Sequence, residues 1–103
     1  MYNINMDTIK FEWDEDKNFI NQIKHGVSFE EAKTVFYDEY ALLDYDKKNS
    51  IGEDRFRILG ISKKGNVLLV AHCTRQNDTI IRIISSRHAT SNEKKNYERS
   101  RRL

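Results

Sequence analysis

The alternation of hydrophobic and polar positions predicts a helix near the beginning of the chain. Asp14 is a residue type that caps helix starts, and the two acidic residues after it suit the positive first turn. Phe19, Ile20 and Ile23 follow at helical spacing and form the apolar stripe of this helix, the side that ordinarily faces a core. Gly26 can supply the left-handed residue that commonly ends a helix.

A second short helix is predicted directly after this glycine turn. Ser28 and Glu31 have the spacing of a capping box, in which each side chain bonds the backbone N–H of the other residue. Val27 is placed for the hydrophobic contact that often accompanies such a cap, and the helical pattern runs through Phe36.

The rest of the pattern is typical of β-strands joined by short turns. The strand-like segments are residues 9–13, 40–43, 55–62, 67–74 and 79–86. The run 67–74 is almost continuously apolar, which predicts a central strand covered on both sides. Thr90 and Glu93 form another capping box and open a mostly polar C-terminal helix.

This order of elements predicts an α+β fold in a single domain spanning residues 1–103. Consecutive strands with short connections form an antiparallel meander, so we expect three or four antiparallel strands with the two N-terminal helices packed on one face. No proline and only four glycines occur, and we expect no linker or repeat.

Charge is distributed very unevenly along the chain. Residues 1–54 hold 6 Lys and 13 acidic residues, whereas residues 55–103 hold 12 basic and 3 acidic residues, including all eight arginines. The net charge of +2 therefore conceals a strongly basic half. Because the arginine fork binds phosphate at two points, this asymmetry suggests a polyanion partner such as RNA or DNA. The alternative is that the arginines pair with acids of the first half.

The remaining composition narrows the class of protein. The single cysteine, Cys73, excludes an internal disulfide and a multi-cysteine zinc site, and its apolar surroundings favour a place in the core. No apolar stretch reaches the ~20 residues that a membrane span needs, and the first ten residues lack a signal-peptide pattern. We therefore expect a cytoplasmic protein without a membrane partner.

Three blocks of sequence, in the same order and with similar gaps, resemble the BrnT family of toxins. They are residues 11–14 with 24–32, 35 and 36; residues 52–56 with 60; and residues 81–87 with 89, 93 and 97. The resemblance implies a RelE-like fold and an endoribonuclease that cuts RNA and arrests translation, as the toxin of a type II toxin–antitoxin system. It also implies a BrnA-like DNA-binding antitoxin as partner, so that DNA is contacted only indirectly. His72 and Cys73 depart from the family pattern, which leaves His72 without a family-derived role.

RNA cleavage without a metal requires a base, an acid and fixed cations that stabilise the added charge of the phosphorane. No cluster of carboxylates, His or Cys has metal-site spacing, so we expect neither a metal nor a cofactor; the acids of residues 12–16 and 30–31 are better interpreted as helix-start charges. The catalytic cation candidates are Arg55, Arg75, Arg82 and Arg87. His25 is the first acid–base candidate and His88 the second, because imidazole titrates near neutral pH. Further RNA contacts are expected from Lys24, Arg57 and His88.

Several of these residues have a plain structural alternative. Arg82 lies in an otherwise apolar strand, where an unpaired charge is costly, so a buried ion pair with Glu53 or Asp54 is the competing interpretation. His25 could serve as a cation at the negative end of its helix, and His72 fits a core position. For the whole chain, the alternative is a non-catalytic module that binds nucleic acid or the antitoxin.

Overall fold

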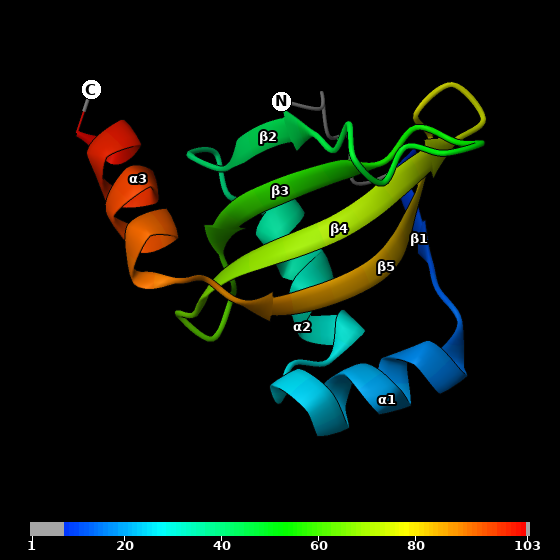
Figure 1. Ribbon diagram of the computed structural model, residues 1–103, viewed down its shortest axis with the longest axis horizontal. Coiled ribbons are helices and arrows are strands. Elements are labelled where there is room, and N and C mark those ends of the chain that lie inside the picture. Colours follow the sequence, from blue (N-terminus) through cyan, green and yellow to red (C-terminus); the bar gives the residue numbers. More distant parts are fainter. Residues whose placement is uncertain (1–7, 103) are drawn as a thin grey trace.

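The computed structural model describes residues 8–102. Its elements are β1 (Lys10–Glu12), α1 (Glu15–His25), α2 (Phe29–Lys33), the 3₁₀ helix η1 (Thr34–Tyr37), β2 (Leu42–Tyr45), β3 (Phe56–Ile61), β4 (Val67–Arg75), β5 (Ile80–His88) and α3 (Ser91–Arg101). In this part of the chain five strands form one sheet in the order β1-β5-β4-β3-β2. Helices α1 and α2 lie on one side of the sheet and α3 lies beside its end, so the other face, toward the viewer in Figure 1, is not crossed by a helix. We call this the open face.

The predicted α+β architecture is confirmed, with one addition to the sheet. Strands β2 to β5 are antiparallel neighbours, as a meander requires. The sheet has five strands rather than three or four, because β1 joins its far edge parallel to β5. Strand β1 pairs only with residues 80–82, so the rest of β5 has no strand neighbour on that side.

Helix α1 covers this uncovered part of β5 with polar side chains. The amide of Asn21 accepts from Ser86 N–H (3.1 Å) and donates to Ser86 C=O (2.8 Å) and to Val27 C=O (2.8 Å). Asn18 accepts from Phe29 N–H (2.8 Å), which ties α1 to α2. Both asparagines are buried: Asn21 satisfies backbone groups of Ser86 that a strand neighbour would otherwise pair, and Asn18 satisfies the first N–H of α2.

The expectation that the apolar stripe of α1 faces the core is therefore wrong. Phe19, Ile20 and Ile23 are 66%, 54% and 72% exposed. The physical reason is that the inner side of α1 meets unpaired backbone groups of β5, which require hydrogen-bonding side chains rather than apolar ones.

The predicted helix ends are largely confirmed. Asp14 caps α1 by accepting from two backbone N–H groups, and Gly26 ends it at φ 68°. Ser28 accepts from Glu31 N–H, but the capping box is only half formed. The Glu31 carboxylate accepts instead from Ser62 Oγ (2.6 Å) and Asn66 Nδ2 (2.9 Å), and so anchors the β3–β4 turn to α2. Burial acts to raise the pKa of Glu31, but these hydrogen bonds outweigh it and lower the pKa.

The core lies between the sheet and the helices, and β4 is central as predicted. Only one of its faces is covered, however: Leu68, Val70 and His72 are buried under the helices, while Leu69 and Ala71 are half-buried on the open face. The His72 ring packs edge-on against the Phe36 ring and is stacked with the Phe56 ring, with centroids 6.1 Å apart. Burial lowers the pKa of His72 from 6.5 to about 4, which keeps the ring neutral.

Helix α3 begins with the predicted capping box of Thr90 and Glu93. Its one buried side chain, Tyr97, donates to Asp38 Oδ2 (2.5 Å), which also accepts from Ile61 N–H (2.8 Å). The position of α3 is thus fixed relative to β3 and to the end of η1. No helix in residues 8–102 is long and apolar enough to cross a membrane.

Candidate functional site

The open face is where the sheet brings arginines together. Cross-strand neighbours point to the same face of a sheet, and the register pairs Glu12 with Arg82 and Arg82 with Cys73. Arg75 follows Cys73 by two positions, so it shares this face. Strict alternation would turn Arg87 to the opposite face.

A β-bulge removes this conflict. His72 pairs with Ile83, whereas Ala71 pairs with Ser85, so Ile84 is an extra residue in β5. The extra residue restores the same facing for Arg82 and Arg87.

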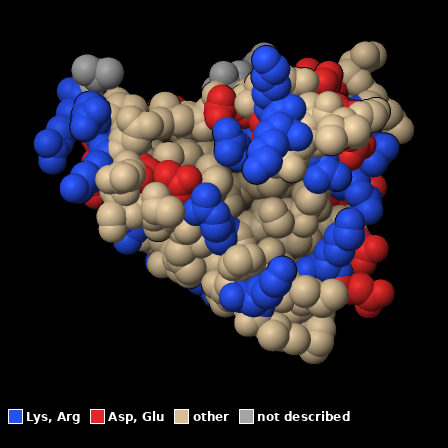
Figure 2. Space-filling model, in the orientation of Figure 1, with Lys and Arg blue, Asp and Glu red and all other residues tan. Residues whose placement is uncertain are grey.

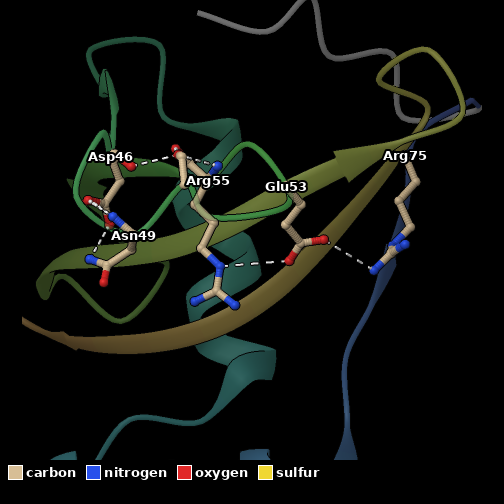
Figure 3. A network of polar contacts seen from close by, with 6 residues as sticks. Asp46, Asn49, Glu53, Arg55 and Arg75 are labelled. Carbon is tan, nitrogen blue, oxygen red and sulfur yellow. Dashed lines mark hydrogen bonds and ion pairs between the residues drawn. The ribbon is translucent and has the colours of Figure 1, made fainter.

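Three of the arginines form a network with two glutamates. Arg82 Nη1 lies 3.0 Å from Glu12 Oε2, and Arg75 Nε lies 3.8 Å from Glu12 Oε1. Glu53 continues the chain, with its two carboxylate oxygens 3.8 Å from Arg75 Nη2 and 3.7 Å from Arg55 Nε. Figure 3 shows Arg55 and Arg75 reaching toward Glu53 from opposite sides. We call these five residues the arginine network.

Arg57 and Arg87 lie on the same face but outside this network. Arg57 Nη2 binds Asp44 Oδ2 on β2 at 2.6 Å. Arg87 makes a two-point contact with Glu93, at 2.8 and 3.1 Å. This pairing lowers the pKa of Glu93 to about 2 and raises that of Arg87.

The area between these cations is uncharged. Leu69, Ala71 and Ile84 lie half-buried in β4 and β5, and the thiol of Cys73 is buried beside the arginine network. Burial, followed by the charge of Glu53, raises the pKa of Cys73, so the thiol stays protonated. In Figure 2, Lys and Arg side chains border an area of uncharged residues over the middle of the sheet.

The predicted histidines do not join the arginine network. Lys24 and His25 are exposed in the last turn of α1, which belongs to the helix side of the sheet. His88 is exposed at the end of β5 and lines a pocket with Lys94 and Arg101 of α3. In residues 8–102 no group of three His, Cys, Asp or Glu side chains could hold a metal ion.

Two members of the network were not expected to take part in the site. Glu12 was interpreted as a helix-start charge, but it lies in β1 and bridges Arg75 and Arg82. The sequence carried one signal for it, since Glu12 falls between the apolar residues Phe11 and Trp13 of an alternating strand. Glu53 was considered only as a partner of Arg82, which binds Glu12 instead.

The fold and this face define a small α+β protein with a cationic sheet surface backed by helices. A family model described as the ribonuclease toxin BrnT of type II toxin–antitoxin systems matches residues 13–93. The chain belongs to this family of ribonuclease toxins.

Comparison with solved structures gives the same fold. The crystal structure of the Brucella abortus ribonuclease toxin BrnT superposes with a TM-score of 0.62 at 23% sequence identity, covering 82% of this chain and 100% of that chain. The comparison with curated proteins finds no match.

Proposed function

We propose that the open face binds RNA and that the ribonuclease activity of the family is carried out there without a metal ion. The observation that supports this most strongly is the convergence of Arg55, Arg75 and Arg82 from three separate segments onto one side of the sheet. Arg57 and Arg87 extend this cationic surface across the sheet. An antiparallel sheet with fixed guanidinium groups can hold successive phosphates while uncharged residues between them leave room for the nucleotides.

The proposed reaction is the attack of a ribose 2′-oxygen on the adjacent phosphorus. The new bond joins the 2′-oxygen to phosphorus, and the bond from phosphorus to the 5′-oxygen breaks. A base takes the proton of the 2′-OH and an acid supplies one to the leaving 5′-oxygen, which leaves a cyclic 2′,3′-phosphate. The arginines stabilise the additional negative charge of the phosphorane. Cleavage of RNA in this way arrests translation.

His25 is the acid–base group that we propose first, with His88 second. Both are exposed and neither touches the arginine network, so RNA bound on the open face would have to reach round the edge of β5 to meet either imidazole. The edge of β5 beyond β1 is bordered by α1, the helix that ends at His25.

End-labelled RNA cut by the purified protein tests the site. Arg82→Ala and Arg75→Ala should each slow cleavage, and each should reduce the salt slope of single-stranded RNA binding by ~0.7. Arg99→Ala in α3 is the matched control, since Arg99 is exposed and lies outside the open face. Equal losses for Arg82→Ala and Arg99→Ala would contradict the assignment. RNA affinity without new RNA ends would support a binding module instead of a nuclease.

Two further measurements test the chemistry. His25→Ala should lower the cleavage rate by ~10²–10⁴ while RNA affinity stays nearly unchanged, the usual effect of losing a proton-transfer group. Unchanged cutting would remove His25 and move the role to His88. Cleavage should persist in EDTA and yield the cyclic phosphate, whereas activity lost in EDTA and restored by Mg²⁺ would overturn the metal-free mechanism.

We also propose a BrnA-like DNA-binding antitoxin as the cognate partner, with DNA contacted only through it. A cationic open face suits an acidic or helix-forming antitoxin segment, and opposite charge would speed their association. Co-expression with the product of the adjacent gene should yield a complex at moderate salt. Failure to form one would refute this pairing.

A further inference from the structure

The outer side of α1 is an apolar ridge without a partner in the described residues. Phe19 and Ile20 are consecutive, Ile23 follows them one helical turn later, and all three stand opposite the buried pair Asn18 and Asn21. Their exposed fractions, 66%, 54% and 72%, correspond to roughly 350 Å² of surface, a size typical of the largest apolar patch on a monomer, which is often functional. The polar inner side of α1 is already used by β5 and α2, so the helix cannot roll to bury this ridge without losing those hydrogen bonds.

We propose that this ridge binds the same ridge of a second copy of the chain, in a two-fold symmetric dimer with the two α1 helices antiparallel. A ridge on a straight helix packs well against another helix, whose side chains fill the spaces between its own. A two-fold axis at the level midway between Phe19 and Ile23 places Phe19 of one copy beside Ile23 of the other, so the same residues cover each other on both sides.

The charges of α1 favour this partner and this direction. The first turn of α1 is acidic, with Glu15 and Asp16, and its last turn is basic, with Lys24 and His25. Antiparallel pairing brings the acidic turn of each copy next to the basic turn of the other, whereas parallel pairing would place like charges together. The helix dipoles are opposed in the antiparallel arrangement, which is also favourable.

The size of the ridge sets the expected strength of the dimer. A stable interface buries about 800 Å² on each partner, and the ridge supplies less than half of that, with the rest coming from its charged rim. We therefore expect a dissociation constant of about 1 μM or weaker. The dimer leaves the open face of both copies accessible (Figure 1), but its charged rim includes His25, the acid–base group proposed first, so the dimer is tested by its mass rather than by RNA cleavage.

Sedimentation equilibrium over micromolar to sub-millimolar concentrations tests this inference. The wild-type chain, at 12.2 kDa, should shift toward twice that mass as concentration rises. Ile20→Asp and Ile23→Asp should remain monomeric with unchanged circular dichroism, because both side chains are exposed. Ile51→Asp is the matched control: Ile51 is 86% exposed in the β2–β3 loop, and its replacement should leave the dimer intact.

A charge exchange tests the antiparallel direction. Asp16→Lys and Lys24→Asp should each weaken the dimer, and the double variant should restore it. A dimer that survives Ile20→Asp and Ile23→Asp would place the interface elsewhere and overturn the proposal. A wild-type chain that stays monomeric would also overturn the proposal. If Ile23→Asp then also lost binding to the antitoxin, the ridge would be a binding site for the antitoxin instead.

Discussion

Replacing Asn21 by alanine should detach α1 from the edge of β5. The Asn21 amide makes three hydrogen bonds, one to Val27 C=O and two to the backbone of Ser86, which lies 65 residues away in sequence. It acts like a short piece of neighbouring strand, accepting from the N–H and donating to the C=O of the same residue. Alanine is compatible with the helix, but it leaves all three of these backbone groups without the amide that bonds them.

The size of the destabilisation follows from the burial of the Ser86 and Val27 backbone groups that lose their hydrogen bonds. Ser86 and Val27 are 1% and 0% exposed, so water does not easily replace the amide. An unsatisfied buried polar group costs about 1–3 kcal/mol, and the higher helix propensity of alanine returns at most ~0.7 kcal/mol. We therefore expect Asn21→Ala to lower the free energy of unfolding by roughly 2–4 kcal/mol, or the Tm by ~10 °C or more.

Urea unfolding followed by circular dichroism measures this loss, and hydrogen exchange locates it. The Ser86 amide should exchange faster in Asn21→Ala, because its acceptor is gone. Asn96→Ala in α3 makes the same substitution at an exposed helical site and should leave the free energy of unfolding unchanged or raise it by at most ~0.7 kcal/mol. Equal effects of the two substitutions, or an unchanged Ser86 exchange rate, would show that the edge of β5 does not need α1.

Three further predictions concern the interior. The pKa of His72 is about 4 in the fold and 6.5 in the unfolded chain, so the unfolded state takes up the proton first as pH falls. The free energy of unfolding should therefore be highest above pH 6.5 and decline by up to ~3 kcal/mol toward pH 4. His72→Phe should remove this decline from unfolding curves measured across this pH range. Gly60→Ala should destabilise the fold by ~1–3 kcal/mol in urea unfolding, because the new Cβ would lie 2.9 Å from both Ala41 Cβ and Asp38 Oδ2; no loss would mean that Asp38 and Ala41 can move away. Ser86→Ala should leave stability unchanged or raise it by ~1 kcal/mol, since the buried Ser86 hydroxyl has no hydrogen-bond partner in the described residues, and a lower Tm would reveal a partner.

The features predicted well from the sequence are those decided by neighbouring residues. Asp14, Gly26 and the pair Thr90 and Glu93 act on backbone groups within a turn of themselves, so local chemistry is sufficient to place them. The strand meander follows for the same reason, because short turns bring consecutive strands together.

The features predicted poorly depend on partners far away in the chain. The apolar pattern of α1 was a sound local signal, but the inner side of the helix was decided by Ser86 on β5. Glu31 had the spacing of a capping box, yet Ser62 and Asn66 took its carboxylate. In each case a buried polar group on a distant element outweighed a local preference worth about 1 kcal/mol.

The arginine network is consistent with both interpretations of the charge distribution, phosphate binding by the arginines and pairing of the arginines with acidic residues. Arg55, Arg75 and Arg82 do pair with acids of the first half, through Glu12 and Glu53. All five side chains are at least 31% exposed, and exposed pairs contribute only about 0–1 kcal/mol each. A phosphate that accepts two hydrogen bonds from a guanidinium can therefore compete with these carboxylates at small cost. Meanwhile the glutamates reduce the repulsion between three neighbouring cations and hold them in position. The acidic half of the sequence thus organises the cationic surface that the basic half supplies.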